Sequence, residues 1–566
     1  MGHEIAIWKL VCLWIAEGFI PTINEWEYRI IDAEEEAQKY LNDLIERNLV
    51  TLIKRRADGQ IKTCRIHDTL HEFCKSEAAR KKLFLVMDKE QSRLDENTCS
   101  ARRLCFHSCT DDENKSSILL SPFGKHIHSL FLSSPQKSEV CLAPDELATI
   151  PNIFPLLRVL NIEYIEFINN MLPKEVYRLY LLKYIAISGN LNLLPKSFKN
   201  LVELETLVIK TTARTLQIVG GIWNMEKLRH VCTNTSAQLP FPPKTSKANS
   251  GGKNILTLST ISPESCTKEI FRRTPNLQKL GVRGNLSQLL EGKQETCLFN
   301  NLQLLKGLLN LKLYMYGKHN EGLTVPMLDK FACRLKKLSF SGTRFEWKDM
   351  RVLGLLEELE VLKLDDYAFK GENWELSNDV VFKRLQYLRI GKTNLKSWMV
   401  TENSFPTLRS LNLQSCSSLE KIPQAFAKVH TLKEMVLFNV RESATQSAKG
   451  VRESIKSGGF KLNITSVKRR VVINAFMKDQ KDRNKAKKIA ARFSGVESAS
   501  IQENGHLEVI GDVDAVEMVG MLRKRLGQAA ELISVGPVYA FDHPNTSTSS
   551  QEIVSILSCS FLPRTT

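Results

Sequence analysis

The sequence contains no run of about 18 apolar residues, so it predicts no membrane-spanning helix. Its N-terminus also lacks the basic and then apolar layout of a secretory signal peptide. Its 13 cysteines include no Cys-x-x-Cys pair, which argues against a zinc site or a disulfide framework and favours reduced thiols. These absences predict a cytoplasmic protein without a transmembrane segment, and leave attachment at the periphery of the plasma membrane open.

A phosphate-binding loop of the form Gly-x-x-x-x-Gly-Lys-Ser/Thr is also missing. The nearest sequence, at 251–254, has neither the upstream glycine nor the hydroxyl residue. Because such loops supply the backbone donors and the lysine that cradle phosphates, we expect this chain alone to bind no ATP or ADP strongly and to hydrolyse none. The expectation is a protein that is not an enzyme and holds no cofactor by itself.

What the sequence does have is an apolar unit, Leu-x-x-Leu-x-Leu or a close variant, that returns about every 24 residues. Within each unit, alternation places leucines inward and charged residues outward on a short strand. A dozen such units in register predict an α/β leucine-rich-repeat solenoid (horseshoe) over residues 101–440, with a parallel sheet. The middle apolar residues are Leu104, Leu130, Leu160, Ile185, Leu207, Val231, Leu256, Leu280, Leu311, Leu338, Leu362, Leu388, Leu411 and Met435.

Residues 1–72 have a different pattern. Apolar residues crowd a short helical stretch that ends near Gly18, a second helix is expected over 34–47, and two strand-like runs flank a turn at Asp58-Gly59. Helix, helix and hairpin is the layout of a winged helix. Residues 73–100 are expected to form a helical connector to the repeats.

The chain after the repeats divides into three parts. Residues 441–468 are polar and aperiodic, which predicts a linker. Residues 469–538 alternate as strand, helix, strand, strand, helix, strand, with Asn504-Gly505 as a turn and Asp514 as a helix cap, which is the ferredoxin-like plan. The Ser/Thr-rich tail, 539–566, is expected to be disordered.

Three ordered motifs near the N-terminus resemble the end of the nucleotide-binding switch of plant intracellular immune receptors with leucine-rich repeats. They are Trp8 to Ile20, Tyr40 to Leu49, and Arg65-Ile66-His67-Asp68 with the residues that follow. Within that family, the sequence is most similar to the coiled-coil class and its late-blight-resistance group. The resemblance covers roughly residues 1–440. Because the phosphate-binding loop and a coiled coil are missing, the resemblance implies an N-terminally truncated member.

In such receptors, as the resemblance implies, the histidine at the position of His67 contacts the β-phosphate of ADP and the aspartate at the position of Asp68 helps to hold the resting state. Without the resemblance, a His-Asp pair at a helix start is an ordinary capping arrangement. ADP and ATP would therefore belong to the intact receptor, with this chain supplying only a sensor of the bound nucleotide.

The segment from Val471 to Met477 and the runs 495–498 and 509–514 resemble heavy-metal-associated domains. There, two cysteines grip a copper ion, and here those positions hold Asp479 and Asp482, which are too hard as ligands for that metal. We therefore expect no metal. In plant immune receptors such degenerate domains look like integrated decoys for pathogen effectors, and the resemblance places the binding surface on the two central strands. The residues expected to set specificity are Glu497, Ser500, Gln502 and Glu508.

The sequence thus predicts a plant disease resistance protein or fragment whose partners are a pathogen effector protein and other immune receptor or signalling proteins. The net charge of +17 leaves a nucleic-acid-binding winged helix as one alternative. Asp32 and three glutamates open its second helix and would repel phosphate, so no nucleic acid is expected. A metal carrier acting through residues 469–538 is the other alternative.

Overall fold

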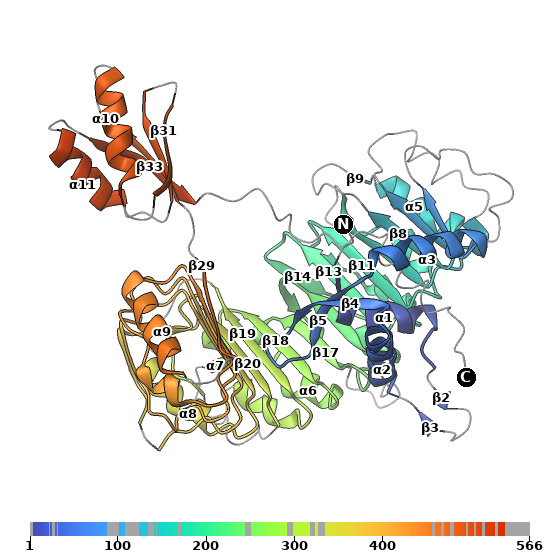
Figure 1. Cartoon of the computed structure of the whole chain (residues 1–566). Helices are drawn as coiled ribbons and strands as arrows, with labels where there is room; N and C mark the ends of the chain where they lie inside the picture. Colours follow the sequence, from blue (N-terminus) through green and yellow to red (C-terminus); the bar gives the residue numbers. More distant parts are fainter. Residues whose placement is uncertain are drawn as a thin grey trace.

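The computed structural model of the chain describes most of the winged helix, the repeats and the C-terminal unit (Figure 1). The described residues are 4–21, 23–24, 29–30, 32–87, 101–107, 124–133, 141–142, 144–167, 171–243, 251–290, 298–316, 323–326, 334–377, 379–455, 459–465, 469–475, 480–493, 496–502, 505–511, 515–526 and 530–537.

The N-terminal segment forms the predicted winged helix. Gly18 ends its first helix in the left-handed conformation (φ 79°), and the Asp32 side chain accepts hydrogen bonds from the backbone of Glu34 and Glu35 at the start of the second. Gly59 (φ 80°) lies in the turn between two antiparallel strands. The elements are β1 Ile5–Ala6, α1 Ile7–Glu17, β2 Ile23–Asn24, β3 Arg29–Ile30, α2 Ala33–Glu46, β4 Val50–Arg55, β5 Ile61–Ile66 and α3 Asp68–Arg80, with sheet order β1-β5-β4.

The repeats form one curved parallel sheet in which each apolar unit supplies a strand. Nearly all of the predicted middle residues take inward positions; at one unit Leu258, which pairs with Val231 and Leu280, does so instead of Leu256, which precedes the strand. The strands, in the order in which they pair, are β6 Phe84–Met87, β7 Arg103–His107, β8 Ser129–Ser133, β10 Val159–Phe167, β11 Tyr184–Gly189, β13 Thr206–Thr211, β15 His230–Thr233, β17 Thr257–Ile261, β18 Lys279–Gly284, β19 Asn310–Met315, β20 Lys337–Ser341, β22 Val361–Asp365, β25 Tyr387–Gly391, β27 Ser410–Gln414, β28 Glu434–Phe438 and β29 Lys461–Thr465.

Short strands and helical turns return the chain from each strand to the next. The short strands are β9 Cys141–Leu142, β12 Leu193–Leu194, β14 Thr215–Ile218, β16 Ser236–Gln238, β21 Phe345–Glu346, β23 Phe369–Lys370, β24 Asn373–Glu375 and β26 Ser397–Met399. The α-helices are α5 Pro144–Ile153, α6 Lys268–Arg273, α7 Ser287–Leu290, α8 Met350–Gly354 and α9 Glu442–Ser454. The 3-10 turns are η2 Gly124–His126, η3 Lys174–Arg178, η4 Lys196–Asn200, η5 Ile222–Asn224, η7 Pro263–Ser265, η8 Leu298–Leu304, η9 Trp347–Asp349 and η10 Gln424–Lys428.

The predicted linker at 441–468 is wrong over most of its length. Ala444, Ala448 and Val451 lie on one side of α9 and are buried in the core of the solenoid, and β29 pairs with β28 as a further parallel strand. Small residues at helical spacing, rather than leucines, make this last covering layer, so the leucine pattern did not reveal it. In the expected helical connector at 73–100, α3 continues to Arg80, but residues 84–87 form β6, which pairs with β7, and residues 88–100 lie outside the described ranges.

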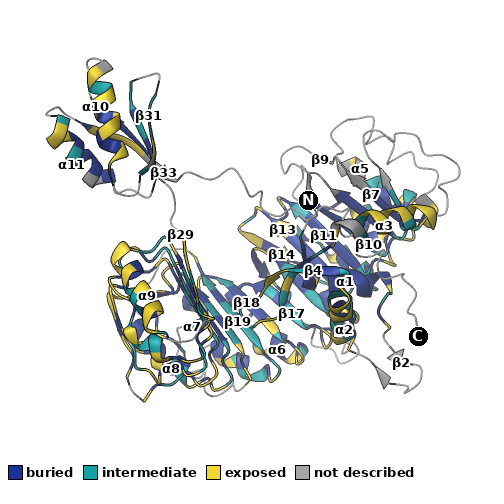
Figure 2. Cartoon of the chain, viewed as in Figure 1, coloured by how far each residue is buried: buried dark blue, intermediate teal, exposed yellow. Residues whose placement is uncertain are grey.

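The C-terminal unit has a core that shares no residue with the solenoid. Its elements, in the expected order, are β30 Arg469–Asn474, α10 Gln480–Ala491, β31 Val496–Ile501, β32 Leu507–Gly511, α11 Ala515–Leu526 and β33 Glu531–Pro537. The antiparallel sheet order is β31-β32-β30-β33, and both helices keep an exposed face (Figure 2). The expected turn at Asn504 and the expected cap at Asp514 lie outside the described residues, as does the tail 539–566.

Candidate functional site: the contact between the winged helix and the repeat sheet

Apart from Lys9 and Glu17, helix α1 is apolar on all sides, and the structure shows why. It lies between the rest of the winged helix and the repeat sheet, and every residue from Lys9 to Glu17 is buried. Helix α1 meets the face of the sheet opposite the leucine core. We call that face of the sheet the concave face. Its side chains that share a core with the winged helix are Cys105, Phe131, Val159, Tyr184, Ala186 and Val208.

One row of concave-face positions, aligned across the sheet by strand register, defines where the winged helix sits. Under the winged helix the row is mostly apolar: Cys105, Phe131, Asn161, Ala186, Val208 and Cys232. Further along the sheet, past α1, the row becomes polar and basic: Gly281, Lys312, Ser339, Lys363, Arg389 and Asn412. An apolar residue at an outward strand position needs a covering partner, and the winged helix supplies it.

A buried charge cluster crosses the contact at the N-terminal end of α1. The Glu163 carboxylate of β10 pairs with Lys9 of α1 on one oxygen and with Lys210 of β13 on the other. The Lys9 and Glu163 side chains are 6% and 5% exposed, whereas Lys210 reaches solvent. Burial acts to raise the pKa of Glu163, but the two ammonium groups dominate and hold it at about 2.

A second buried ion pair lies at the C-terminal end of α1. The Glu17 carboxylate accepts a hydrogen bond from Nε of Arg103 in β7 at 2.9 Å and another from the Ser129 hydroxyl of β8. The guanidinium of Arg103 also lies 5.0 Å from the centre of the Phe19 ring and 5.5 Å from that of Phe84. Both ends of the helix are therefore tied to the sheet by charge-assisted bonds.

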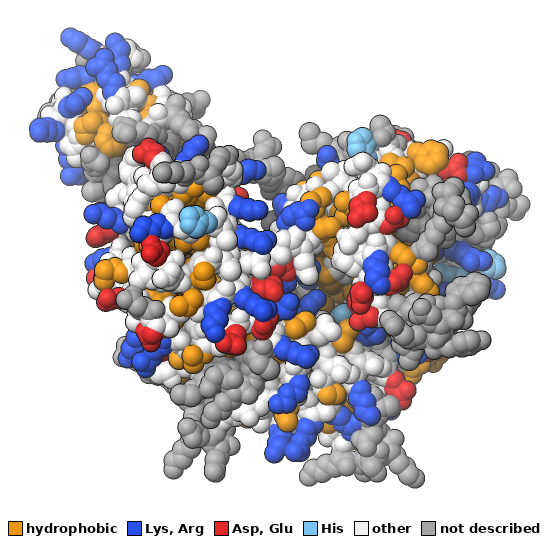
Figure 3. Space-filling model, turned by 60° about the horizontal axis from the view of Figure 1, so that its bottom comes forward, with side chains coloured by type: hydrophobic (Ala, Val, Ile, Leu, Met, Phe, Trp, Pro, Cys, Tyr) orange, Lys and Arg blue, Asp and Glu red, His pale blue; other side chains and the backbone are white. Residues whose placement is uncertain are grey.

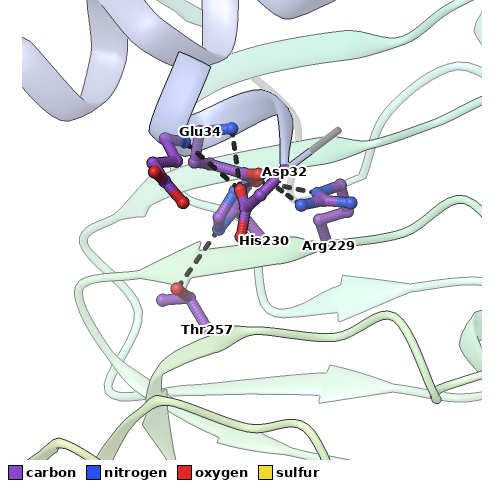
Figure 4. A network of polar contacts seen from close by, with 6 residues as sticks. Asp32, Glu34, Arg229, His230 and Thr257 are labelled. Carbon is purple, nitrogen blue, oxygen red and sulfur yellow. Dashed lines mark hydrogen bonds and ion pairs between the residues drawn. The ribbon is translucent and has the colours of Figure 1, made fainter. Parts of the chain in front are cut away.

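The first turn of α2 makes the third contact, drawn in Figure 4. Glu34 receives a bidentate contact from Arg229, with Nε 2.7 Å from Oε1, and its Oε1 lies 3.0 Å from Nε2 of His230. The other ring nitrogen of His230 lies 3.2 Å from the Thr257 hydroxyl. Burial would raise the pKa of Glu34, but the bonds to His230 and Arg229 outweigh it and keep the pKa well below its ordinary value.

The hairpin of the winged helix reaches furthest along the sheet. Asp58, at the turn between β4 and β5, pairs with Lys337 of β20, and the Asp58 side chain is 4% exposed. Figure 1 shows the two strands of the hairpin lying toward β17 and β20. This contact places a winged-helix carboxylate in the basic part of the concave face.

The carboxylates in this contact predict acid release of the winged helix. A folded-state pKa below the ordinary value means that unfolding takes up protons, so the stabilisation is full above about pH 4.5 and is lost as pH falls toward 2. For Glu163 the shift from 4.5 to about 2 corresponds to about 3 kcal/mol. Urea unfolding at pH 6 and pH 2.5 should show that the difference between the native chain and Glu163→Gln shrinks by about that amount. A difference independent of pH would contradict the assignment.

The structure places His67 and Asp68 directly after β5, at the start of α3. His67 is exposed and is the N-cap residue of α3, without a side-chain capping bond, and Asp68 is the first residue of the helix. The pair therefore lies at a helix N-terminus, as expected, although the ordinary side-chain capping arrangement is not made by His67.

The described part of the C-terminal unit brings two of its expected site residues together. Ser500 of β31 is opposite Glu508 of β32, with the hydroxyl 3.5 Å from Oε2, and Arg470 of β30 pairs with Glu508 at 2.9 Å. Gln502 follows the end of β31. The side chain of Glu497 and all of Asp479 lie outside the described residues, and Asp482 lies in the first turn of α10. No cluster of metal-ligating side chains occurs among the residues described.

Sequence reasoning missed the contact between the winged helix and the sheet. A signal was present: Phe131, Tyr184 and Val208 are apolar at outward positions where alternation calls for polar residues. The ion pairs left no such signal, because Lys9 and Glu163 are 154 positions apart.

A winged helix docked on a leucine-rich-repeat sheet through a shared core defines a solenoid protein whose repeats cover a winged-helix segment. Residues 1–74 match the Disease resistance protein Winged helix domain, and residues 137–456, more than half of the chain, match the Leucine-rich repeat region. The chain therefore belongs to the plant disease resistance proteins that combine a winged helix with leucine-rich repeats.

Two relatives are late blight resistance protein homologs of Solanum demissum. One is 31% identical over 534 residues, which cover 91% of this chain and 65% of the relative; the other is 29% identical over 551 residues, covering 92% and 38%. The chain thus spans between a third and two thirds of the length of the relatives it matches.

Among solved structures, an internalin from Listeria monocytogenes is similar over 70% of this chain and 94% of its own, with 11% identity and a TM-score of 0.36. The plant peptide hormone receptor RGFR1 in complex with RGF2 is similar over 68% and 66%, with 13% identity and a TM-score of 0.34. Of the helices that the structure describes, none has both the length and the apolar character to cross a bilayer.

Proposed function

We propose that the chain is the sensing and restraining part of a plant intracellular immune receptor. The observation that carries this proposal is the contact described above, in which the repeats cover α1 and bind charged groups of the winged helix at four places. A repeat domain fastened in this way opposes any movement of the winged helix. A ligand that binds the repeats better when the winged helix is released would shift the population toward the released state.

The moving part would be an ADP/ATP switch to which the winged helix belongs in the intact receptor of the coiled-coil class. His67 fits a phosphate contact because its imidazole is exposed at the N-terminus of α3, where backbone N–H groups also favour an anion. Bound ADP would supply that anion, and Asp68 beside it would help to hold the resting state. We propose that the receptor acts in the cytoplasm together with other immune receptor or signalling proteins.

The C-terminal unit would be a heavy-metal-associated-like decoy for a pathogen effector. Its element order and its sheet order β31-β32-β30-β33 support the ferredoxin-like plan. The sheet face that carries Ser500 and Glu508 is opposite the face that packs on the helices, so it is available for a partner. Gln502, directly after β31, would extend this surface.

The nucleic-acid alternative is less well supported, because the second helix is engaged elsewhere. Glu34 binds Arg229 and His230, and a duplex would have to displace the repeats to reach this part of α2. Figure 3 shows basic side chains mixed with acidic ones on the face of the molecule that it presents. Such mixing is typical of a solvated surface rather than of a continuous basic surface that binds the phosphates of a nucleic acid.

The proposal is tested by joining the chain to the part of a Solanum demissum relative that it does not cover and expressing the chimera in leaves. The unaltered chimera should be silent, whereas Val208→Arg, which breaks the contact, and Asp68→Val, which alters the switch, should each cause cell death without a pathogen. Val436→Arg, at the same row of the sheet but away from the winged helix, is the matched control and should remain silent. Silent Val208→Arg and Asp68→Val chimeras at normal abundance would contradict the proposal.

A further inference from the structure

The basic part of the concave face is a candidate binding surface of its own. Lys312, Ser339, Lys363 and Arg389 occupy one row on consecutive strands β19, β20, β22 and β25. With Tyr314 they help to line a hollow of about 400 Å³. Lys279 of β18 and Lys337 of β20 lie in a neighbouring row, two positions before Gly281 and Ser339, and they extend this basic surface. We call these residues the lysine row.

The charges of the lysine row are only partly balanced within the chain. Arg389 pairs with Asp365 at 2.9 Å, and Lys337 pairs with Asp58. Within the described ranges, Lys279, Lys312 and Lys363 form no ion pair with a carboxylate. Burial, followed by neighbouring positive charges such as Arg56 and Arg389, lowers the pKa of each of these lysines. The surface therefore favours an incoming negative charge.

The register indicates how carboxylates would fit. Adjacent strands lie about 4.8 Å apart, so Lys312 and Lys363 are roughly 10 Å apart with the small side chain of Ser339 between them. A carboxylate above Ser339 could reach both ammonium groups. From β18 to β25 the row crosses four such steps, roughly 19 Å, which is the length of about six extended residues.

Two observations favour a protein segment over a compact anion. The lysines without carboxylate partners are spread along the row rather than converging on one point, and the aromatic rings of Tyr314 and Tyr387 lie among them. In addition, the hairpin turn of the winged helix already brings a carboxylate to this surface, where Asp58 pairs with Lys337, although Arg56 of the same hairpin lies near Lys279 and Lys312. A strand of acidic residues would repeat that contact several times.

We propose that the lysine row binds an acidic protein segment rich in Asp and Glu, and that this segment competes with Asp58 for Lys337. Binding would then replace one of the four polar contacts that hold the winged helix and would favour its release. The binding step stands alone, whereas its effect on signalling rests on the proposed function. Because coupling is reciprocal, removing the Asp58 charge must tighten the binding of the segment.

The test uses the full chain and fluorescein-labelled hexaglutamate, with binding followed by fluorescence anisotropy. Replacing Lys312 and Lys363 together by serine should weaken binding roughly tenfold. Lys383→Ser with Lys428→Ser removes the same charge from exposed ion pairs with Glu357 and Glu402 and should change binding less than about twofold. Equal losses in the two double variants, or no loss in either, would overturn the site. Unchanged thermal midpoints check that both variants fold.

Two further arms separate the remaining possibilities. Asp58→Asn should bind the peptide about threefold more tightly, and an unchanged affinity would overturn the competition. Inorganic tripolyphosphate should displace the labelled peptide less effectively than unlabelled hexaglutamate at equal charge, and the reverse order would overturn the assignment to a protein segment. These outcomes do not depend on cell death in leaves, so failure of this proposal and failure of the proposed function are distinguishable.

Discussion

Replacing Val208 with arginine is expected to detach the winged helix from the repeats, at a cost of more than about 4 kcal/mol to the contact. Val208 is 4% exposed on the concave face and belongs to the core shared with α1. Arginine adds both volume and a charge where there is room for neither, and α1 cannot move away without exposing its own apolar surface. The repeats should remain folded, because Leu207 and Ile209 of the same strand face the separate leucine core.

Alkylation of Cys12 measures this release directly. Cys12 is a free thiol on α1 with 5% exposure, and burial raises its pKa to about 12, so it should react very slowly in the native chain. In Val208→Arg the thiol should react at a rate close to that of an unfolded reference. The Val436→Arg control should leave the slow rate unchanged, since Val436 lies on β28 and is not part of the shared core. Slow alkylation in Val208→Arg would refute the proposed role of this contact.

The elements of the fold could be predicted from local pattern, because each is specified by nearby residues. Gly18 and Gly59 mark an end and a turn of the winged helix by conformational preference, and Asp32 marks the start of α2 by the backbone hydrogen bonds that its side chain accepts. Leucines at fixed spacing specify the strands by the same local rule. Helix α9 was not predicted, because Ala444 and Ala448 are small residues whose burial depends on packing against the preceding turn η10 rather than on their own hydrophobicity.

The candidate site was less predictable, because its chemistry is assembled by stacking. Glu34 meets Arg229 and His230 only because the solenoid brings β15 under α2. In sequence, Glu34 is 195 positions from Arg229 and 196 from His230. The apolar residues of the same contact were detectable, since alternation identifies outward positions strand by strand. The sequence therefore indicates where on the sheet the contact lies. The ion pairs of the contact could not be predicted, because they depend on the tertiary arrangement.

Replacing Glu163 with glutamine is expected to destabilise the same contact by about 3–5 kcal/mol. Glutamine keeps the shape of the side chain but removes the charge, and the ammonium of Lys9, which is 6% exposed, then lies in the interface without its carboxylate. Lys210 should suffer less because it is 54% exposed. Hydrogen exchange of the α1 amides and urea unfolding should both report the loss.

A double variant distinguishes a stranded charge from lost packing. Lys9→Met with Glu163→Leu removes both charges and should recover most of the stability, because a buried ion pair and an apolar pair of similar volume differ little in free energy. Glu203→Gln, which removes a carboxylate from the exposed pair with Lys227, should change stability by less than about 1 kcal/mol. If the double variant were as unstable as Glu163→Gln, the ion pair itself would be holding the winged helix in place. Recovery would instead assign the holding force to the apolar core around α1, with the charges selecting the position at which it docks.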